Sequence, residues 1–84
     1  MYKVIVSKSA SKELAELPTQ IVNRIIPAIK RLGENPRPAG CKKLKGEQDS
    51  WRIRIGDYRV IYTIDDVIHI VDVRSVGHRK DIYE

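Results

Sequence analysis

The sequence contains a single cysteine and no long apolar run, and both shortages exclude classes of protein. Among its 84 residues only Cys41 carries a thiol, so the chain can form neither an internal disulfide framework nor a cysteine-rich zinc site. No apolar stretch approaches the length of a membrane-spanning helix, and the N-terminus lacks the charged and then apolar order of a signal peptide. We therefore expect a cytoplasmic protein without a membrane partner.

Motifs that bind cofactors are absent as well. The sequence has no Walker loop, no GxGxxG fingerprint and no spacing of ligand residues that is typical of a metal site. Repeats and low-complexity segments are also missing. We therefore predict neither a cofactor nor a bound metal. A length of 84 residues fits one domain, residues 1–84, whose small hydrophobic core gives marginal stability.

Acidic residues are the minority among the charged ones. Sixteen Lys and Arg stand against eleven Asp and Glu, which gives a formal net charge of +5 and a pI near 9.6. A charge of this sign attracts polyanions, chiefly nucleic acid, although many basic proteins bind none. A hydrophobic fraction of 42% excludes a disordered chain. The composition is that of a folded basic protein.

The strongest local pattern covers residues 51–62 and predicts a β-hairpin. Apolar and polar residues alternate on both sides of Gly56-Asp57, and a glycine in the first position of a two-residue turn suits type II′. This turn places Arg54 opposite Arg59. Like charges that face each other destabilise a sheet, so the pair suggests an anionic partner. One face collects Trp51, Ile53, Ile55, Tyr58, Val60 and Tyr62, and the other collects Arg52, Arg54 and Arg59.

Caps and apolar periodicity predict the elements before the hairpin. The β-branched residues within 2–6 predict a short strand, and Ser7 or Ser9 is the candidate N-cap of a first helix. A stripe of apolar residues at spacings of three and four predicts a second helix that begins at Pro18. Because the stripe continues in phase beyond Pro27, we expect one bent helix there and not two helices.

The stretch of residues 36–50 has no regular pattern and predicts a long basic connection. Lys42, Lys43 and Lys45 charge it, and Lys80 adds a further lysine in the C-terminal tail. A single lysine in such a place usually faces solvent, whereas a cluster that leads into an arginine-bearing hairpin favours contact with a phosphate backbone. We therefore predict that these four lysines contact the phosphate backbone of a nucleic acid.

A second two-residue turn is predicted at residues 65–66, after the hairpin. It would place Arg59 opposite Asp72, so that this carboxylate joins the arginine pair. It would also place His69 opposite Tyr62 on the apolar face, where we expect a satisfied core histidine. The predicted fold class is α+β: a strand, two helices and a three-stranded antiparallel meander, giving one sheet with helices on one face.

Three segments match motifs of a known family in the expected order. They are KLKG at residues 43–46, the hairpin at residues 51–62, and VGHRKDIY at residues 76–83. Together they resemble the RelE/ParE superfamily of toxins from type II toxin–antitoxin systems, and the resemblance spans almost the whole chain. It implies partners: a cognate RelB-like antitoxin, the ribosome and messenger RNA. A heterotetramer of toxin and antitoxin is compatible with it.

The resemblance to RelE-type members implies cleavage of messenger RNA in the ribosomal A site, where the ribose 2′-hydroxyl attacks the adjacent phosphate. It implies that Arg52 and Arg54 contact RNA and assist proton transfer, and that Arg59 holds the scissile phosphate. It further implies that Arg79 lies near the leaving group and that Tyr83 stacks on or orients the target nucleotide. His78 matches a basic position that can act as an acid.

The identity of the general base is open. A guanidinium binds phosphate well through two parallel hydrogen bonds, but a pKa above about 12 leaves it protonated at neutral pH. Arg54, where the family often has lysine, is therefore a poor base. Tyr83, His78 and Glu47 remain, and we favour His78 as acid or base and Tyr83 as the positioning residue.

Two other functions stay in view. The first is a ParE-like toxin that inhibits DNA gyrase with the same fold and without nuclease activity. Gyrase-directed members generally lack the arginine, histidine and tyrosine set, so the tail from His78 to Tyr83 favours the nuclease. The second is a basic RNA-binding module without catalysis.

Overall fold

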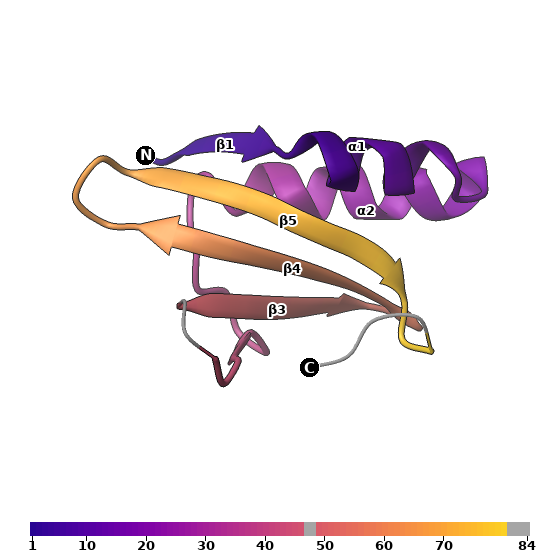
Figure 1. Ribbon diagram of the computed structural model, residues 1–84. Helices are drawn as coiled ribbons and strands as arrows, with labels where there is room; N and C mark the ends of the chain where they lie inside the picture. Colours follow the sequence, from indigo (N-terminus) through magenta and orange to yellow (C-terminus); the bar gives the residue numbers. More distant parts are fainter. Residues whose placement is uncertain (47–48, 81–84) are drawn as a thin grey trace.

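The computed structural model describes residues 1–46 and 49–80, which form two helices and one five-stranded sheet (Figure 1). Along the chain the elements are β1 (Lys3–Val6), α1 (Lys8–Ala15), α2 (Thr19–Arg31), β2 (Lys42–Lys43), β3 (Ser50–Ile55), β4 (Tyr58–Asp65) and β5 (Ile70–His78). The strand order is β1-β5-β4-β3-β2, with β1 parallel to β5 and the other neighbours antiparallel. The predicted α+β class is confirmed.

Local signals place the helix ends close to the predicted positions. Ser7 is the N-cap of α1, and its Oγ accepts a hydrogen bond from the Ala10 amide at 3.1 Å. Helix α2 begins directly after Pro18 and continues through Pro27, as predicted. Neither helix, within the residues described, has the length and apolar character needed to cross a membrane.

The core lies between the two helices and one face of the sheet. Its buried members are Ala10, Leu14, Ile25, Ile29, Leu32, Ile53, Val60, Tyr62, Val71, Val73 and Val76. Tyr62 is the largest of the fully buried side chains, and its hydroxyl donates a 2.6 Å hydrogen bond to the carbonyl oxygen of Pro36. Burial raises the pKa of Tyr62, so the phenol stays neutral. This bond fastens the connection after α2 to the centre of the sheet.

The register of the β3–β4 hairpin is the predicted one. Every predicted pair is present, including Arg54 opposite Arg59. Gly56 has a φ of 61°, the left-handed conformation that glycine adopts at least cost. The two-residue turn at Gly56-Asp57 and the burial of the apolar face therefore both require the same register.

The β4–β5 turn is longer than predicted. The chain reverses through residues 66–69 and not through a two-residue turn. The Asp65 carboxylate accepts hydrogen bonds from the amides of Val67 and Ile68 at 2.9 and 3.1 Å, and His69 closes the turn with a φ of 57°. An aspartate that binds the amides following it stabilises such a loop.

His69 is consequently not a core residue, and that prediction was wrong. Val73 occupies the position opposite Tyr62. The His69 side chain is exposed, and its ring stacks on Tyr2 with 4.7 Å between the centroids. The longer turn thus moves the histidine from the apolar face to the end of the sheet.

Asp72 does not join the arginine pair, so that prediction was also wrong. Gly77 lies opposite Arg59, whereas Asp72 lies opposite Thr63. There the Asp72 carboxylate accepts a 2.9 Å hydrogen bond from Arg74 on its own strand. Asp72 therefore does not relieve the repulsion within the arginine pair.

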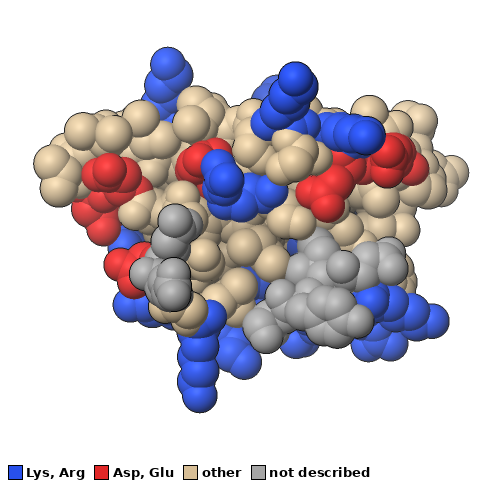
Figure 2. Space-filling view, viewed as in Figure 1, with Lys and Arg blue, Asp and Glu red and all other residues tan. Residues whose placement is uncertain are grey.

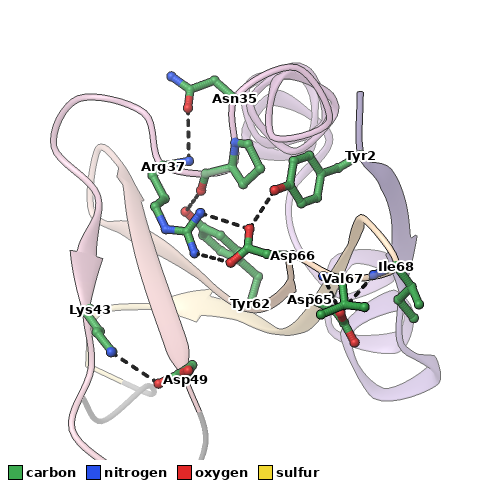
Figure 3. A network of polar contacts seen from close by, with 11 residues as sticks. Tyr2, Asn35, Arg37, Lys43, Asp49, Tyr62, Asp65, Asp66, Val67 and Ile68 are labelled. Carbon is green, nitrogen blue, oxygen red and sulfur yellow. Dashed lines mark hydrogen bonds and ion pairs between the residues drawn. The ribbon is translucent and has the colours of Figure 1, made fainter.

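A polar network ties the connection after α2 to the β4–β5 turn (Figure 3). The Arg37 guanidinium donates hydrogen bonds of 3.2 and 2.9 Å to the Asp66 carboxylate, and the Tyr2 hydroxyl donates one of 2.6 Å. Arg37 also lies 5.0 Å from the ring centroid of Trp51. The hydrogen bonds from Arg37 and then Tyr2 lower the pKa of Asp66 to about 2. Four segments that are distant in sequence meet here.

We predict that this network makes stability depend on acid pH. The pKa of Asp66 falls from an ordinary value of 3.8 to about 2 on folding, so its contribution is present above about pH 4 and is lost as the pH falls toward 2. Asp66→Asn should lower the melting temperature at neutral pH, and the difference from the wild type should shrink on acidification. A difference that stays constant between about pH 6 and pH 2 would contradict this prediction.

The turn glycine generates a second prediction. At Gly56 a side chain would impose the left-handed φ on an L-residue, and its β-carbon would lie 3.4 Å from Nη2 of Arg24. Gly56→Val should therefore destabilise the fold by about 1–2 kcal/mol in urea denaturation. Asp57→Ala, at the second turn position, is the matched control, and an equal loss in both variants would show that the backbone conformation is not the cause.

Candidate functional site

The helix-free face of the sheet carries the arginines of β3 and β4. Side chains alternate between the two faces of a strand, so Arg52, Arg54 and Arg59 leave on the side opposite to the core residues Ile53 and Val60. Arg54 and Arg59 are direct cross-strand neighbours, for which β-carbons lie about 5 Å apart. Two guanidinium groups so placed can bind one phosphate together.

The three arginines differ in accessibility. Arg52 lies opposite Ile61 and is only 4% exposed, whereas Arg54 is exposed and Arg59 is half-buried. A buried guanidinium keeps its charge and requires a fixed polar environment. Arg54 and Arg59 are therefore the members that a ligand can reach, and Arg52 lies beneath the surface.

The predicted lysine cluster lies beside the hairpin. Lys42 and Lys43 form β2, which pairs with β3 next to the arginine pair. Lys43 makes an ion pair with Asp49 at 3.2 Å, and Lys42 and Lys45 are exposed. Figure 2 shows Lys and Arg side chains projecting from the lower edge of the molecule, where Figure 1 shows β3. This edge offers positive charge to a polyanion.

The chain after β5 is fastened to the hairpin turn. The Arg79 amide donates a 2.8 Å hydrogen bond to the carbonyl oxygen of Asp57. The Lys80 amide donates a 3.2 Å hydrogen bond to Nδ1 of His78. Arg79 and Lys80 are both exposed. The structure thus brings the predicted tail residue Arg79 to the turn end of the hairpin that carries the arginine pair.

His78 lies on the opposite face of the sheet from the arginine pair. It stands opposite Tyr58, and the two rings meet edge to face with 5.3 Å between their centroids. Together with Glu13 and Leu17 of α1 it lines a cavity of about 350 Å³. The structure therefore does not bring the His78 ring together with Arg54 and Arg59.

The two other candidates for the general base, Tyr83 and Glu47, lie outside the described residues. Among the residues that are described, no three His, Cys, Asp or Glu side chains gather as metal ligands would. The described part of the site is thus a set of cations that can bind and orient a phosphodiester.

Arg24 of α2 reaches the hairpin turn, a contact that the sequence did not predict. The guanidinium lies against the open side of Gly56, 3.4 Å from where a β-carbon would be. Arg24 is an exposed residue of its helix, and no local pattern pairs a helical residue with a distant turn. Gly56 is the only feature of the sequence that points to this contact, because its missing side chain leaves room at the turn for a side chain from another element.

Residues 4–83 match the family described as "ParE toxin of type II toxin-antitoxin system, parDE". "Putative toxin RelE1" of Methanocaldococcus jannaschii is 32% identical, with 99% of this chain and 96% of that protein covered. "Toxin RelG" of Mycobacterium tuberculosis is 34% identical, with 98% of this chain and 95% of that protein covered. The chain is thus similar over almost its full length to proteins named as RelE-type toxins.

Solved structures share the fold. A chain of the archaeal RelE–RelB complex from Pyrococcus horikoshii matches with a TM-score of 0.83 and 29% identity, and the match covers 96% of this chain and 98% of that one. A chain of the toxin–antitoxin complex RelBE2 from Mycobacterium tuberculosis matches with a TM-score of 0.81 and 30% identity. This match covers 93% of this chain and 98% of that one. The chain belongs to the ParE family of type II toxin–antitoxin toxins, in its RelE-like branch.

Proposed function

We propose that this RelE-like toxin is a ribosome-dependent endoribonuclease that cleaves messenger RNA in the A site. The observation that carries the proposal is the cross-strand pair of Arg54 and Arg59 on the helix-free face. One phosphodiester can accept hydrogen bonds from both guanidinium groups. The similarity to proteins named RelE1 and RelG supports the same activity.

In the proposed reaction the ribose 2′-hydroxyl attacks the adjacent phosphorus and loses its proton to a base. The 5′-oxygen leaves and takes up a proton, and a 2′,3′-cyclic phosphate forms. Arg54 and Arg59 stabilise the charge that develops on the non-bridging oxygens. The Arg79 backbone is held at the hairpin turn, and its side chain serves the leaving group. Arg52, which is buried on the same strand as Arg54, adds positive charge near the pair.

RNA on either side of the cleaved bond would contact the basic edge. Lys42 and Lys45 are exposed beside the hairpin, and Lys80 is exposed beside the turn. Their contacts with the phosphate backbone add affinity without base specificity. Lys43, which is paired with Asp49, must exchange that partner for a phosphate.

Proton transfer needs groups other than arginine, because guanidinium does not release its proton at neutral pH. In this proposal Tyr83 orients the nucleotide or acts as the base, and ribosomal RNA supplies the remaining proton transfer. The His78 ring, on the other face of the sheet, is better placed to hold the tail than to reach a phosphate bound by the arginine pair. Its Nδ1 binds the Lys80 amide and so fixes the backbone directly after β5.

The proposal includes a RelB-like antitoxin that neutralises the toxin. Similar chains from Pyrococcus horikoshii and Mycobacterium tuberculosis are seen in RelE–RelB and RelBE2 complexes. A partner that pairs with the facing arginines would also relieve their repulsion and stabilise the fold. Inhibition of gyrase is the other activity to consider, because the matched family carries the ParE name. Relatives with 32 and 34% identity are named RelE1 and RelG, which favours the nuclease.

Arg59→Ala should lower the rate of cleavage on programmed ribosomes by about 100-fold or more, because it removes a charge that stabilises the transition state. Primer extension maps the cut ends and measures the rate. Arg74→Ala is the matched control, since Asp72 already binds that guanidinium, and it should cleave as the wild type does. Absence of an A-site cut by the wild type, or undiminished cutting by Arg59→Ala, would refute the nuclease.

The role of His78 can be tested by its pH signature. In His78→Asn the side-chain oxygen can accept the Lys80 hydrogen bond in place of Nδ1, so the variant should keep much of the activity and the wild-type pH profile between about pH 5.5 and 8. His69→Asn, on the exposed turn, is the control. Loss of a titration near neutrality in His78→Asn alone would return the ring to the role of acid or base.

A further inference from the structure

The helix-free face of the sheet carries opposite charges at its two ends. Arg54 and Arg59 occupy the end at the β3–β4 turn. Asp65 and Asp72 leave on the same face near the β4–β5 turn, because they alternate with core-facing residues, and Asp49 lies beside them. Arg59 and Asp65 lie six residues apart on β4, or about 20 Å. Figure 2 shows acidic side chains at the left of the molecule, where Figure 1 shows the β4–β5 turn.

A groove of about 510 Å³ lies at the acidic end of this face. Ile5 and Ile68, which are exposed by 38 and 63%, contribute to its aliphatic lining. Exposed apolar surface that forms a groove marks a site of contact. The charged residues among its described lining are all carboxylates: Asp49, Asp65 and Asp72. An arginine side chain suits both parts, because its stem packs on apolar surface while its guanidinium binds carboxylates.

Each of the three carboxylates can accept a further cation. The Asp49 side chain is 76% exposed, although it pairs with Lys43. The Asp65 carboxylate binds two amides of its own turn, and no ion pair joins it within residues 1–46 and 49–80. Asp72 binds Arg74 through Oδ2, and a carboxylate offers about four lone-pair sites. The groove therefore keeps negative charge that a guanidinium can bind.

The two ends are complementary in charge, so the face is complementary to a second copy of itself. A two-fold axis that runs parallel to the sheet and crosses the strands at Ile61 exchanges the two ends. Ile61 is half-buried, follows Arg59 by two residues on β4 and lies opposite Arg52 of β3. The axis therefore places Arg54 over the start of β3 in the second copy, next to Asp49. In such an isologous pair each charged contact forms twice, and Ile61 meets its own counterpart.

We propose that two copies of this chain associate through their helix-free faces, with the arginine pair of each copy bound at the acidic groove of the other. The carboxylates are then the anions that relieve the repulsion between Arg54 and Arg59. Association rests on the charges and apolar residues of the face and not on the nuclease activity. Its consequence rests on the proposed function: the dimer is inactive, because each copy occupies the arginines that would bind RNA.

The size of the face indicates a weak dimer. β4 has 8 residues, or about 27 Å, and the strands β1, β5, β4 and β3 together are about 19 Å wide. Two such faces bury about 1,000 Å² in total, which is typical of transient complexes. We therefore expect a dissociation constant in the micromolar range that rises with salt, because the charged contacts are screened.

Exchange of the charges tests the pairing. In sedimentation experiments on the purified toxin without antitoxin, Arg54→Asp and Asp49→Arg should each raise the dissociation constant of the dimer by about 30-fold or more, because both contacts become repulsive. An equimolar mixture of the two variants should associate within about threefold of the wild type. In that mixed pair the new aspartate faces the new arginine, and the second contact keeps its native residues. Restored association also shows that both variants are folded.

Lys30→Asp is the matched control for Arg54→Asp, because it changes the net charge equally at an exposed position of α2, away from the helix-free face. It should associate within about threefold of the wild type. Three results would each overturn the proposal: a wild type that is monomeric up to about 500 µM, a mixture that associates no more tightly than either variant alone, or an equal loss of association in the control.

Cleavage assays test the consequence separately. The rate per molecule of wild-type toxin should fall as its concentration passes the dissociation constant of the dimer, whereas the rate per molecule of Asp49→Arg should stay constant. A wild-type rate that stays proportional to concentration across this range would overturn the inactive dimer. If the wild type does not cleave message at all, the proposed nuclease fails, while the sedimentation comparison still decides the association.

Discussion

The register of the β3–β4 hairpin is the constraint on which the rest of the structure depends. Side chains alternate with a period of two, so a slip of one residue would turn the arginines toward the helices and the core residues toward solvent. Burial of Val60 and Tyr62 against the helices holds the register, and the left-handed Gly56 closes it. The facing arginines follow from this register. A stable core on one side of the sheet brings two like charges together on the other, and an anion bound between them would relieve their repulsion.

The hairpin could be predicted because turn chemistry and apolar alternation give the same answer there. The β4–β5 connection could not, since its aspartates resemble a tight turn and strand alternation alone permits more than one register. The deciding interaction is local but invisible to a pattern: the Asp65 carboxylate binds the next amides and lengthens the loop. That single difference moved His69 out of the core and Asp72 away from the arginine pair.

The candidate site shows the same division. The face occupied by Arg54 and Arg59 follows from the hairpin, whereas the face occupied by His78 follows from β5, which continues to residue 78. His78 therefore lies on the opposite face of the sheet from Arg54 and Arg59, although it directly precedes Arg79 in the sequence. The contact between Arg24 and the hairpin turn is tertiary and has no local signature. The position of side chains within one pair of neighbouring strands could be predicted from the sequence. Contacts between elements that are distant in the sequence could not.

The parallel pairing of β1 with β5 has a consequence for synthesis. Lys3 to Val6 pair with Ile70 to Val73, so β1 can take its place in the sheet only after β5 has been synthesised. Contacts between such distant residues carry a large loop-closure cost and form late. Until then α1 has no β5 to pack on and the sheet lacks its central pairing. Until β5 is made, β1 has no strand to pair with, so the sheet reaches its full width only after the hairpin that carries Arg54 and Arg59 has been synthesised.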